Sequence, residues 1–148
     1  MSAQKRSLVR DLQQGLIPPE KFTHIAHVEL CFEVFNEDDF ILGTQRICEI
    51  LKNYVASVGA AEKFHLTTTV VASYLVWKKV IEDRDKDFQE FISKNKDIVH
   101  KLLPLLQELY SRDQLESSTY RKHYIPPANL PAKHPLMLFA SSAPQDKD

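Results

Sequence analysis

The stretch Asp38–Gly59, which reads DDFILGTQRICEILKNYVASVG, decides the fold class of this chain. Its apolar residues recur at intervals of three and four positions, which places them on one face of an α-helix. An acidic N-cap candidate opens the stretch, and glycine is a typical residue at a helix C-terminus. The pattern predicts a long helix from Asp38 to Val58, with a buried stripe formed by Ile41, Leu42, Ile47, Cys48, Ile50, Leu51, Tyr54 and Val55.

Two further long helices are predicted on either side of this stretch. The segment Pro19–Phe35 has a broad apolar face with helical spacing. The segment Thr67–Asp83 begins with threonines and valines, which also suit a strand, but its apolar pattern continues over about four turns and is too long for a typical strand. Shorter helices are expected over residues 7–14, 88–95, 98–110 and 111–124, with Pro104 either kinking its helix or lying in the first turn.

These helices predict an all-α fold, a compact bundle of three long and several short helices with an extended C-terminal tail. Residues 1–127 would form a single helical domain. Residues 128–148 would form the extended, partly disordered tail, from which Leu136–Phe139 would dock on the body. The expected core consists of Ile25, Val28, Phe32, Ile47, Leu51, Tyr54, Val71, Tyr74, Leu75, Leu102 and Leu106.

The composition argues against several classes of protein. A chain of 148 residues suits one domain, and its 3 glycines are few for a many-turned β fold. The formal net charge of −1 provides no overall field for nucleic acid or an anionic membrane, so neither partner is expected. The N-terminus lacks the apolar run of a signal peptide, and Cys31 and Cys48 have no framework spacing. We therefore expect reduced thiols in a cytoplasmic protein.

Three histidines in the first half of the chain are the candidates for a functional site. His24 and His27 are three residues apart, so on a helix their side chains meet on one surface. Cys31 follows His27 by one turn and could join or line the site. His65 precedes the third long helix, and a bundle could bring it beside the first. Three converging neutral donors would suit zinc or another divalent transition metal, or a small-molecule ligand between helices.

Each of these residues also has a purely structural interpretation. A His-x-x-His pair is common by chance on an amphipathic helix, where the imidazoles hydrogen-bond or pack against neighbours. A free cysteine such as Cys31 is more often a small core residue than a ligand. Both interpretations stay open at the level of sequence.

Other polar residues lie close to the histidines in the sequence. Glu29 and Glu33 could orient an imidazole or exchange protons with a ligand, or could simply be solvated. Thr67 and Thr69 could donate hydrogen bonds to a ligand, although one threonine of this run is expected to be the helix N-cap. The basic and aromatic run Tyr120–Tyr124 could bind an anion or form ordinary surface.

The sequence carries none of the short motifs of the commonest enzyme classes. It contains no Gly-rich phosphate loop, no Gly-x-Ser-x-Gly, no His-Glu-x-x-His and no Cys-x-x-Cys. These absences remove the commonest nucleotide-binding, hydrolase, zincin and redox interpretations. They leave open whether the chain is an enzyme.

The order of the motifs resembles a family of small, mostly bacterial, uncharacterised proteins. Members of that family carry Phe-x-His-x-x-His, then Lys-Tyr-His-Glu-Thr-x-Thr, then Leu-x-Ser before an arginine and an aromatic–aliphatic–Pro ending. The resemblance covers roughly Phe22–Pro127 and is carried here by Phe22-Thr23-His24 with His27, by Lys63-Phe64-His65-Leu66-Thr67-Thr68-Thr69, and by Leu115-x-Ser117 leading to Arg121 and Tyr124-Ile125.

The resemblance implies that His24, His27 and His65 form one site with Thr67 and Thr69 beside it, and it implies no particular reaction. This chain departs from the family pattern at two positions. Leu66 replaces the glutamate after the third histidine, and Glu29 stands where the family often has arginine. The resemblance therefore implies a divergent member whose activity has changed or been lost.

Two functional hypotheses follow from the sequence. The first is a metal or small-molecule site between helices, with the three histidines as donors and Thr67 or Thr69 as hydrogen-bonding neighbours. The second is a non-catalytic protein interaction domain, such as a homodimer that buries an apolar helix face.

Overall fold

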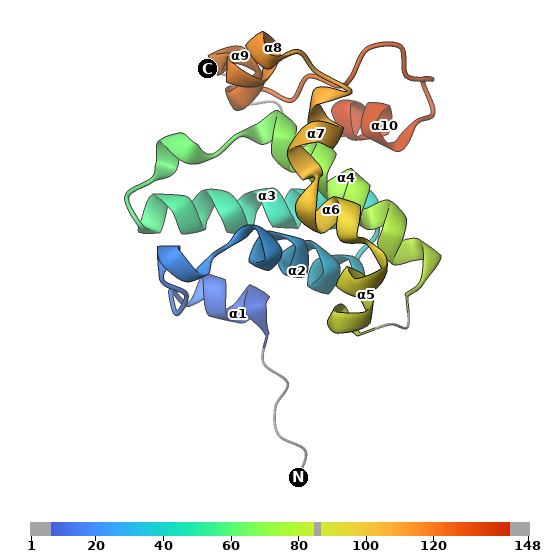
Figure 1. Cartoon of the computed structure of the whole chain (residues 1–148). Coiled ribbons are helices and arrows are strands. Elements are labelled where there is room, and N and C mark those ends of the chain that lie inside the picture. Colours follow the sequence, from blue (N-terminus) through green and yellow to red (C-terminus); the bar gives the residue numbers. More distant parts are fainter. Residues whose placement is uncertain (1–6, 85–86, 143–148) are drawn as a thin grey trace.

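Three helices occupy the centre of the molecule, and each packs against the other two. They are α2 (His24–Phe35), α3 (Phe40–Ser57) and α4 (Leu66–Glu82), and they lie where the sequence predicts its long helices (Figure 1). The computed structural model describes residues 7–84 and 87–142. Every regular element in that part of the chain is a helix, so the predicted all-α fold is confirmed.

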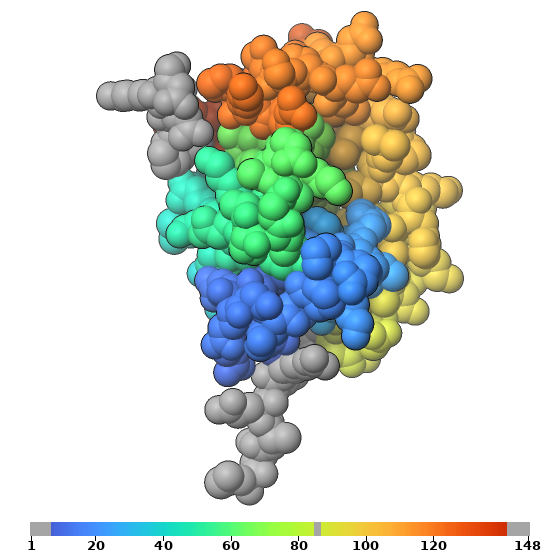
Figure 2. All heavy atoms as spheres, turned by 90° about the vertical axis from the view of Figure 1, so that its left-hand side faces the viewer, coloured from blue at the N-terminus to red at the C-terminus, as the bar shows by residue number. Residues whose placement is uncertain are grey.

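Short helices surround this centre. Figure 1 shows α5, α6 and α7 rising along one side of it, and Figure 2 shows α8 and α9 across the end opposite α1. The surrounding elements are α1 (Leu8–Gln13), the 3₁₀ turns η1 (Pro19–Lys21) and η2 (Ala61–Lys63), α5 (Phe88–Lys94), α6 (Lys96–His100), α7 (Leu102–Gln107), α8 (Arg112–Glu116), α9 (Ser118–Lys122) and α10 (Pro135–Ser142). Among the described residues, no helix combines the length and apolarity that crossing a membrane requires.

The helix predicted over residues 98–110 is broken in two. α6 ends at His100, and Pro104 lies in the first turn of α7. A proline ring clashes with the carbonyl four residues earlier, which here belongs to His100, so one continuous helix cannot pass this point. The break turns α7 to run along α4.

Glu33 anchors the first helix to the centre. Its carboxylate accepts hydrogen bonds from Ser7 Oγ and from the backbone amides of Leu8 at 2.9 Å and Val9 at 3.2 Å. Backbone amides at a helix start have no partner within the helix, so a carboxylate there is stabilising. Glu33 therefore has a structural role that neither sequence interpretation included.

Most of the expected core is confirmed. Val28, Phe32, Ile47, Leu51, Tyr54, Val71 and Leu106 are all buried. The prediction that Ile25 is a core residue was wrong. Its side chain is 42% exposed, because the apolar face of α2 is not covered by another described element at its first turn. Tyr74, Leu75 and Leu102 are half-buried.

The C-terminal segment differs from the extended tail that the sequence predicts. Pro135–Ser142 forms α10, which packs on α3 and α4, while residues 143–148 lie outside the described part of the chain. The predicted docking of Leu136–Phe139 is confirmed, since Leu136 and Phe139 are each 2% exposed. A helix forms because these two residues are three apart and Pro135 suits a first turn.

Gly43 allows α3 to approach the end of α2. A Cβ atom built at this position would lie 2.6 Å from Cε1 of Phe35 and 3.3 Å from Cγ1 of Val34. Both neighbours are 0% exposed, so each is enclosed by other side chains that would have to shift with it. The glycine is therefore needed for packing, although it lies inside a helix where glycine is otherwise unfavourable.

We predict that Gly43→Ala lowers the free energy of unfolding by about 1–3 kcal/mol, the usual cost of overpacking a core. Helix propensity alone would give the opposite sign, because alanine favours a helix over glycine by about 1 kcal/mol. Urea denaturation of both proteins measures the difference. As a control, Phe35→Leu combined with Gly43→Ala should cost less than the sum of the single changes. A Gly43→Ala protein that is more stable than the wild type would show that the close approach to Phe35 and Val34 does not exclude a methyl group at this position.

Candidate functional site

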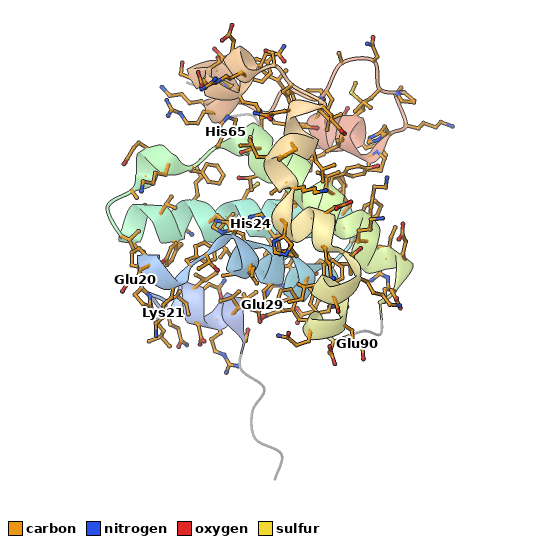
Figure 3. The ribbon with its side chains drawn as sticks, in the orientation of Figure 1. Glu20, Lys21, His24, Glu29, His65 and Glu90 are labelled. Atoms are coloured by element: carbon orange, nitrogen blue, oxygen red, sulfur yellow. The ribbon has the colours of Figure 1, made fainter. Side chains whose placement is uncertain are left out.

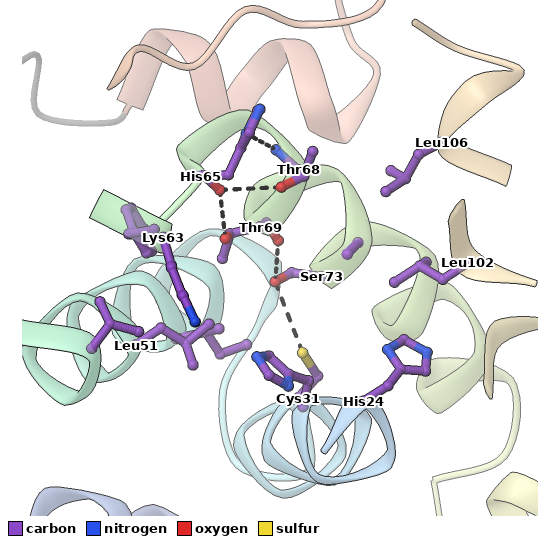
Figure 4. Close-up of a pocket in the computed structure, with 15 residues that line it drawn as sticks. His24, Cys31, Leu51, Lys63, His65, Thr68, Thr69, Ser73, Leu102 and Leu106 are labelled. Atoms are coloured by element: carbon purple, nitrogen blue, oxygen red, sulfur yellow. Dashed lines mark hydrogen bonds between the residues drawn. The ribbon is translucent and has the colours of Figure 1, made fainter. Parts of the chain in front are cut away.

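A cavity of about 380 Å³ lies between α2, α3, α4 and α7 (Figure 4). Its walls are mostly apolar, and three histidines, one lysine and a few hydroxyl groups contribute polar atoms. The lining residues are His24, His27, Cys31, Ile47, Leu51, Val55, Lys63, Phe64, His65, Thr68, Thr69, Ala72, Ser73, Leu102 and Leu106. The space exists because Thr69, Ala72 and Ser73, at helical spacing on α4, are too small to fill the gap to the neighbouring helices.

His24 is oriented by a backbone carbonyl of α6. Its Nε2 lies 3.1 Å from the carbonyl oxygen of Ile98, and a carbonyl only accepts, so Nε2 carries the proton. In the neutral ring, Nδ1 then keeps its lone pair. The bond joins α2 to the short helices that follow α5.

His27 is oriented by its own helix. Its Nδ1 donates to the carbonyl oxygen of Thr23 at 2.9 Å, which leaves the lone pair on Nε2. The ring of Phe22 stacks on the imidazole with 4.0 Å between centroids. His27 is exposed on one side, yet enough protein surrounds the ring that desolvation lowers its pKa. The neutral form is therefore favoured near pH 7.

His65 lines the upper rim of the cavity but points away from the other two histidines. Its Nδ1 accepts the amide of Thr68 at 3.1 Å, and its Nε2 donates to the carbonyl oxygen of Leu115 at 2.8 Å. The imidazole is thus the N-cap of α4, so the expectation that a threonine of this run caps the helix was wrong. Figures 3 and 4 show His65 directed toward the end of the molecule that carries α8, away from His24 and Cys31.

The two predicted threonines have different surroundings. Thr69 lines the cavity, and its hydroxyl donates to the carbonyl oxygen of His65 at 2.6 Å. Thr67 is 0% exposed and lies outside the cavity lining. Its hydroxyl donates to the carbonyl oxygen of His123 at 2.7 Å and accepts the amide of Ile125 at 3.2 Å. Thr67 therefore ties α4 to the segment that follows α9.

Glu29 is outside the set of described residues that line the cavity. Figure 3 shows it on the side of α2 that lies away from His65. Desolvation raises the pKa of this carboxyl group, and the nearby charge of Glu33 raises it further. Glu29 is accordingly not positioned to touch a molecule in this cavity.

Cys31 forms part of the cavity floor. Its Sγ lies 3.9 Å from Oγ of Ser73, and burial raises the pKa of the thiol to about 12. Burial likewise raises the pKa of the Cys48 thiol, on α3, to about 12. Both side chains are therefore neutral thiols near pH 7 and weak nucleophiles.

The histidines share one cavity without forming a metal-binding cluster. Within residues 7–84 and 87–142, no group of three or more His, Cys, Asp and Glu side chains is arranged to hold a metal ion. A metal on His65 would also have to displace Thr68 or Leu115 from the ring nitrogens. Zinc binding at His24, His27 and His65 stays a prediction.

Several lining residues were not expected as site residues from the sequence. Lys63 was quoted only as part of the resemblance, the apolar side chains of α3 and α7 were expected only as buried or core residues, and Ser73 was not named. Small residues three and four apart on α4 were an available signal, because they leave room beside a helix. Nothing local distinguishes Lys63 from an ordinary surface lysine. Its position depends on the turn that η2 makes between α3 and α4.

No protein family, curated protein or solved structure was found to match this chain. The resemblance to the Phe-x-His-x-x-His proteins stays a prediction. The cavity and the groups around it are therefore what bears on function.

We predict that His27 makes the protein less stable as the pH falls below about 6.5. Because burial lowers the pKa of His27 in the folded state, the unfolded chain binds a proton in this range that the folded chain does not. Stability is therefore unaffected by His27 above this range and decreases below it, until the pH passes the lowered pKa. Burial also lowers the pKa of His134, so this residue decreases stability over the same pH range. Its contribution remains in a His27 variant.

His27→Gln should flatten this decrease when urea denaturation is compared at about pH 7.5 and about pH 5.5. The change is a fraction of the roughly 1.4 kcal/mol that one proton contributes per pH unit, since the ring is partly solvated. Equal slopes for the two proteins, or an imidazole of His27 that titrates above 6.5 by NMR, would show that desolvation does not control this residue.

Proposed function

We propose that this chain binds a small, mostly apolar molecule in the cavity between α2, α3, α4 and α7. The observation that carries the proposal is a cavity of about 380 Å³ with largely apolar walls and a few polar groups. Small-molecule sites generally have this construction, with volumes of about 300–1,000 Å³. The cavity is at the small end of that range.

The apolar walls supply the attraction in this proposal. The apolar lining includes Leu51 and Val55 on α3, Ala72 on α4, and Leu102 and Leu106 on α7, and Figure 4 shows Leu51 on the side opposite Leu102 and Leu106. A ligand that covers them removes apolar surface from water, which contributes roughly 25 cal/mol per Å² before the cost of association is subtracted.

The polar groups would fix the orientation of the ligand. The lone pairs on Nδ1 of His24 and Nε2 of His27 are acceptors, because the other nitrogen of each ring is held by a backbone carbonyl. Side chains held in this way lose little freedom when a ligand binds, and a ligand gains affinity from such preorganisation.

We predict that Ala72→Phe prevents binding of a neutral apolar probe, octanamide. The added ring would project into the cavity from α4 and occupy the space that the ligand needs. Titration of the ¹⁵N-labelled protein, followed by amide shifts of α3 and α7, measures the binding. The wild-type protein should show saturable shifts, and the Ala72→Phe protein should show at least a tenfold weaker response, a loss of about 1.4 kcal/mol.

Ala56→Phe is the matched control, because Ala56 lies on an exposed part of α3 outside this cavity. It should bind octanamide like the wild type. Circular dichroism checks that all three proteins remain folded. Absence of saturable shifts in the wild type, or unchanged binding by a folded Ala72→Phe protein, would contradict the proposed function.

A further inference from the structure

The formal charge in the described lining of the cavity is positive. Among the described residues that line it, Lys63 carries the single formal charge, and no aspartate or glutamate is present. No carboxylate of the described part of the chain forms an ion pair with Lys63 within 4.0 Å. The cavity therefore combines an ammonium group, neutral polar groups and apolar walls.

The side chain of Lys63 reaches into the cavity. Figure 4 shows it extending from η2 past Leu51, with its nitrogen on the side nearest Cys31. The same view places Leu102 and Leu106 on the opposite side. Lys63 is an exposed residue. A lysine that lays its methylene groups along apolar surface and keeps its ammonium in contact with water brings one positive charge to the edge of the cavity.

We infer that the molecule bound in this cavity is a monocarboxylate with an apolar body, whose carboxylate pairs with Lys63. This inference rests on the proposed function and narrows its ligand class. The carboxylate would lie at the nitrogen of Lys63, on the side nearest Cys31, and the apolar body would extend toward Leu102 and Leu106.

The balance of charges selects against other ligands. A cationic molecule would be repelled by Lys63 and would find no carboxylate among the described lining residues. A dianionic phosphate ester needs several donors, whereas this cavity offers one ammonium and histidines whose proton-bearing nitrogens already donate to backbone carbonyls. A single carboxylate matches one ammonium and adds a charge-assisted hydrogen bond near low-dielectric walls.

A second group of basic side chains has to be controlled for. A second cavity, of about 800 Å³, shares Phe64 with the first and is lined by Lys52, Arg121, Lys122 and His123, together with Glu62. An anion could be attracted there without entering the first cavity. Lys122 is therefore the matched control for Lys63.

The test compares octanoate with its neutral analogue octanamide, by calorimetry at low salt and below the critical micelle concentration. Wild-type protein should bind octanoate about tenfold more tightly than octanamide, the size of one charge-assisted hydrogen bond. Lys63→Met should reduce this preference to less than about twofold, because the ammonium that pairs with the carboxylate is removed, and Lys63→Arg should restore most of it. Lys122→Met should behave like the wild type.

The possible failures of this test are distinguishable. Equal affinity of the wild type for octanoate and octanamide would overturn the carboxylate inference and leave the proposed function intact. Loss of the preference in Lys122→Met but not in Lys63→Met would place the anion in the other cavity and also overturn it. Failure of both probes to bind the wild type would contradict the proposed function itself.

Discussion

The C-terminal half of this molecule is held in place by side chains of the central helices that bond to backbone groups of the short segments. His24 donates to Ile98, His65 to Leu115 and Thr67 to His123. Helices of five to seven residues, such as α6, α7 and α8, are too short to be stable alone in water. Because α7 is one wall of the cavity, these bonds and the burial of Ile98 and Leu106 in the core together position that wall.

The same bonds determine the chemistry of the cavity. A carbonyl partner on one ring nitrogen of His24 and His27 fixes which nitrogen keeps a lone pair, so the polar character of the walls follows from the packing of the backbone. The deeply buried thiol of Cys31 adds no charge. What remains is an apolar space with neutral acceptors and one ammonium group, which suits recognition of a ligand better than nucleophilic attack on it.

The three long helices were predictable because each carries its own periodic apolar stripe, whose spacing alone indicates a helix. The site was only partly predictable. His24, His27 and His65 all line one cavity, whereas their expected role as three donors to one metal or ligand stays a prediction. The imidazoles of His24 and His65 are oriented by the carbonyl groups of Ile98 and Leu115, which lie 74 and 50 residues later in the chain. No local sequence pattern indicates such distant partners. The sequence did indicate that Pro104 kinks its helix or lies in a first turn, and the structure places it in the first turn of α7. Helix α10, by contrast, depends on tertiary packing against α3 and α4.

One imidazole, that of His65, closes the first turn of α4 and also holds α8, which lies fifty residues later in the sequence. Fraying at one end therefore weakens the other, because detachment of α8 removes one of the two hydrogen bonds that hold the ring and unwinding of the first turn of α4 removes the other. Local opening at these two places belongs to a single cooperative unit. Amide hydrogens at the start of α4 and around α8 would then exchange with solvent as a group, although short surface helices usually lose protection independently.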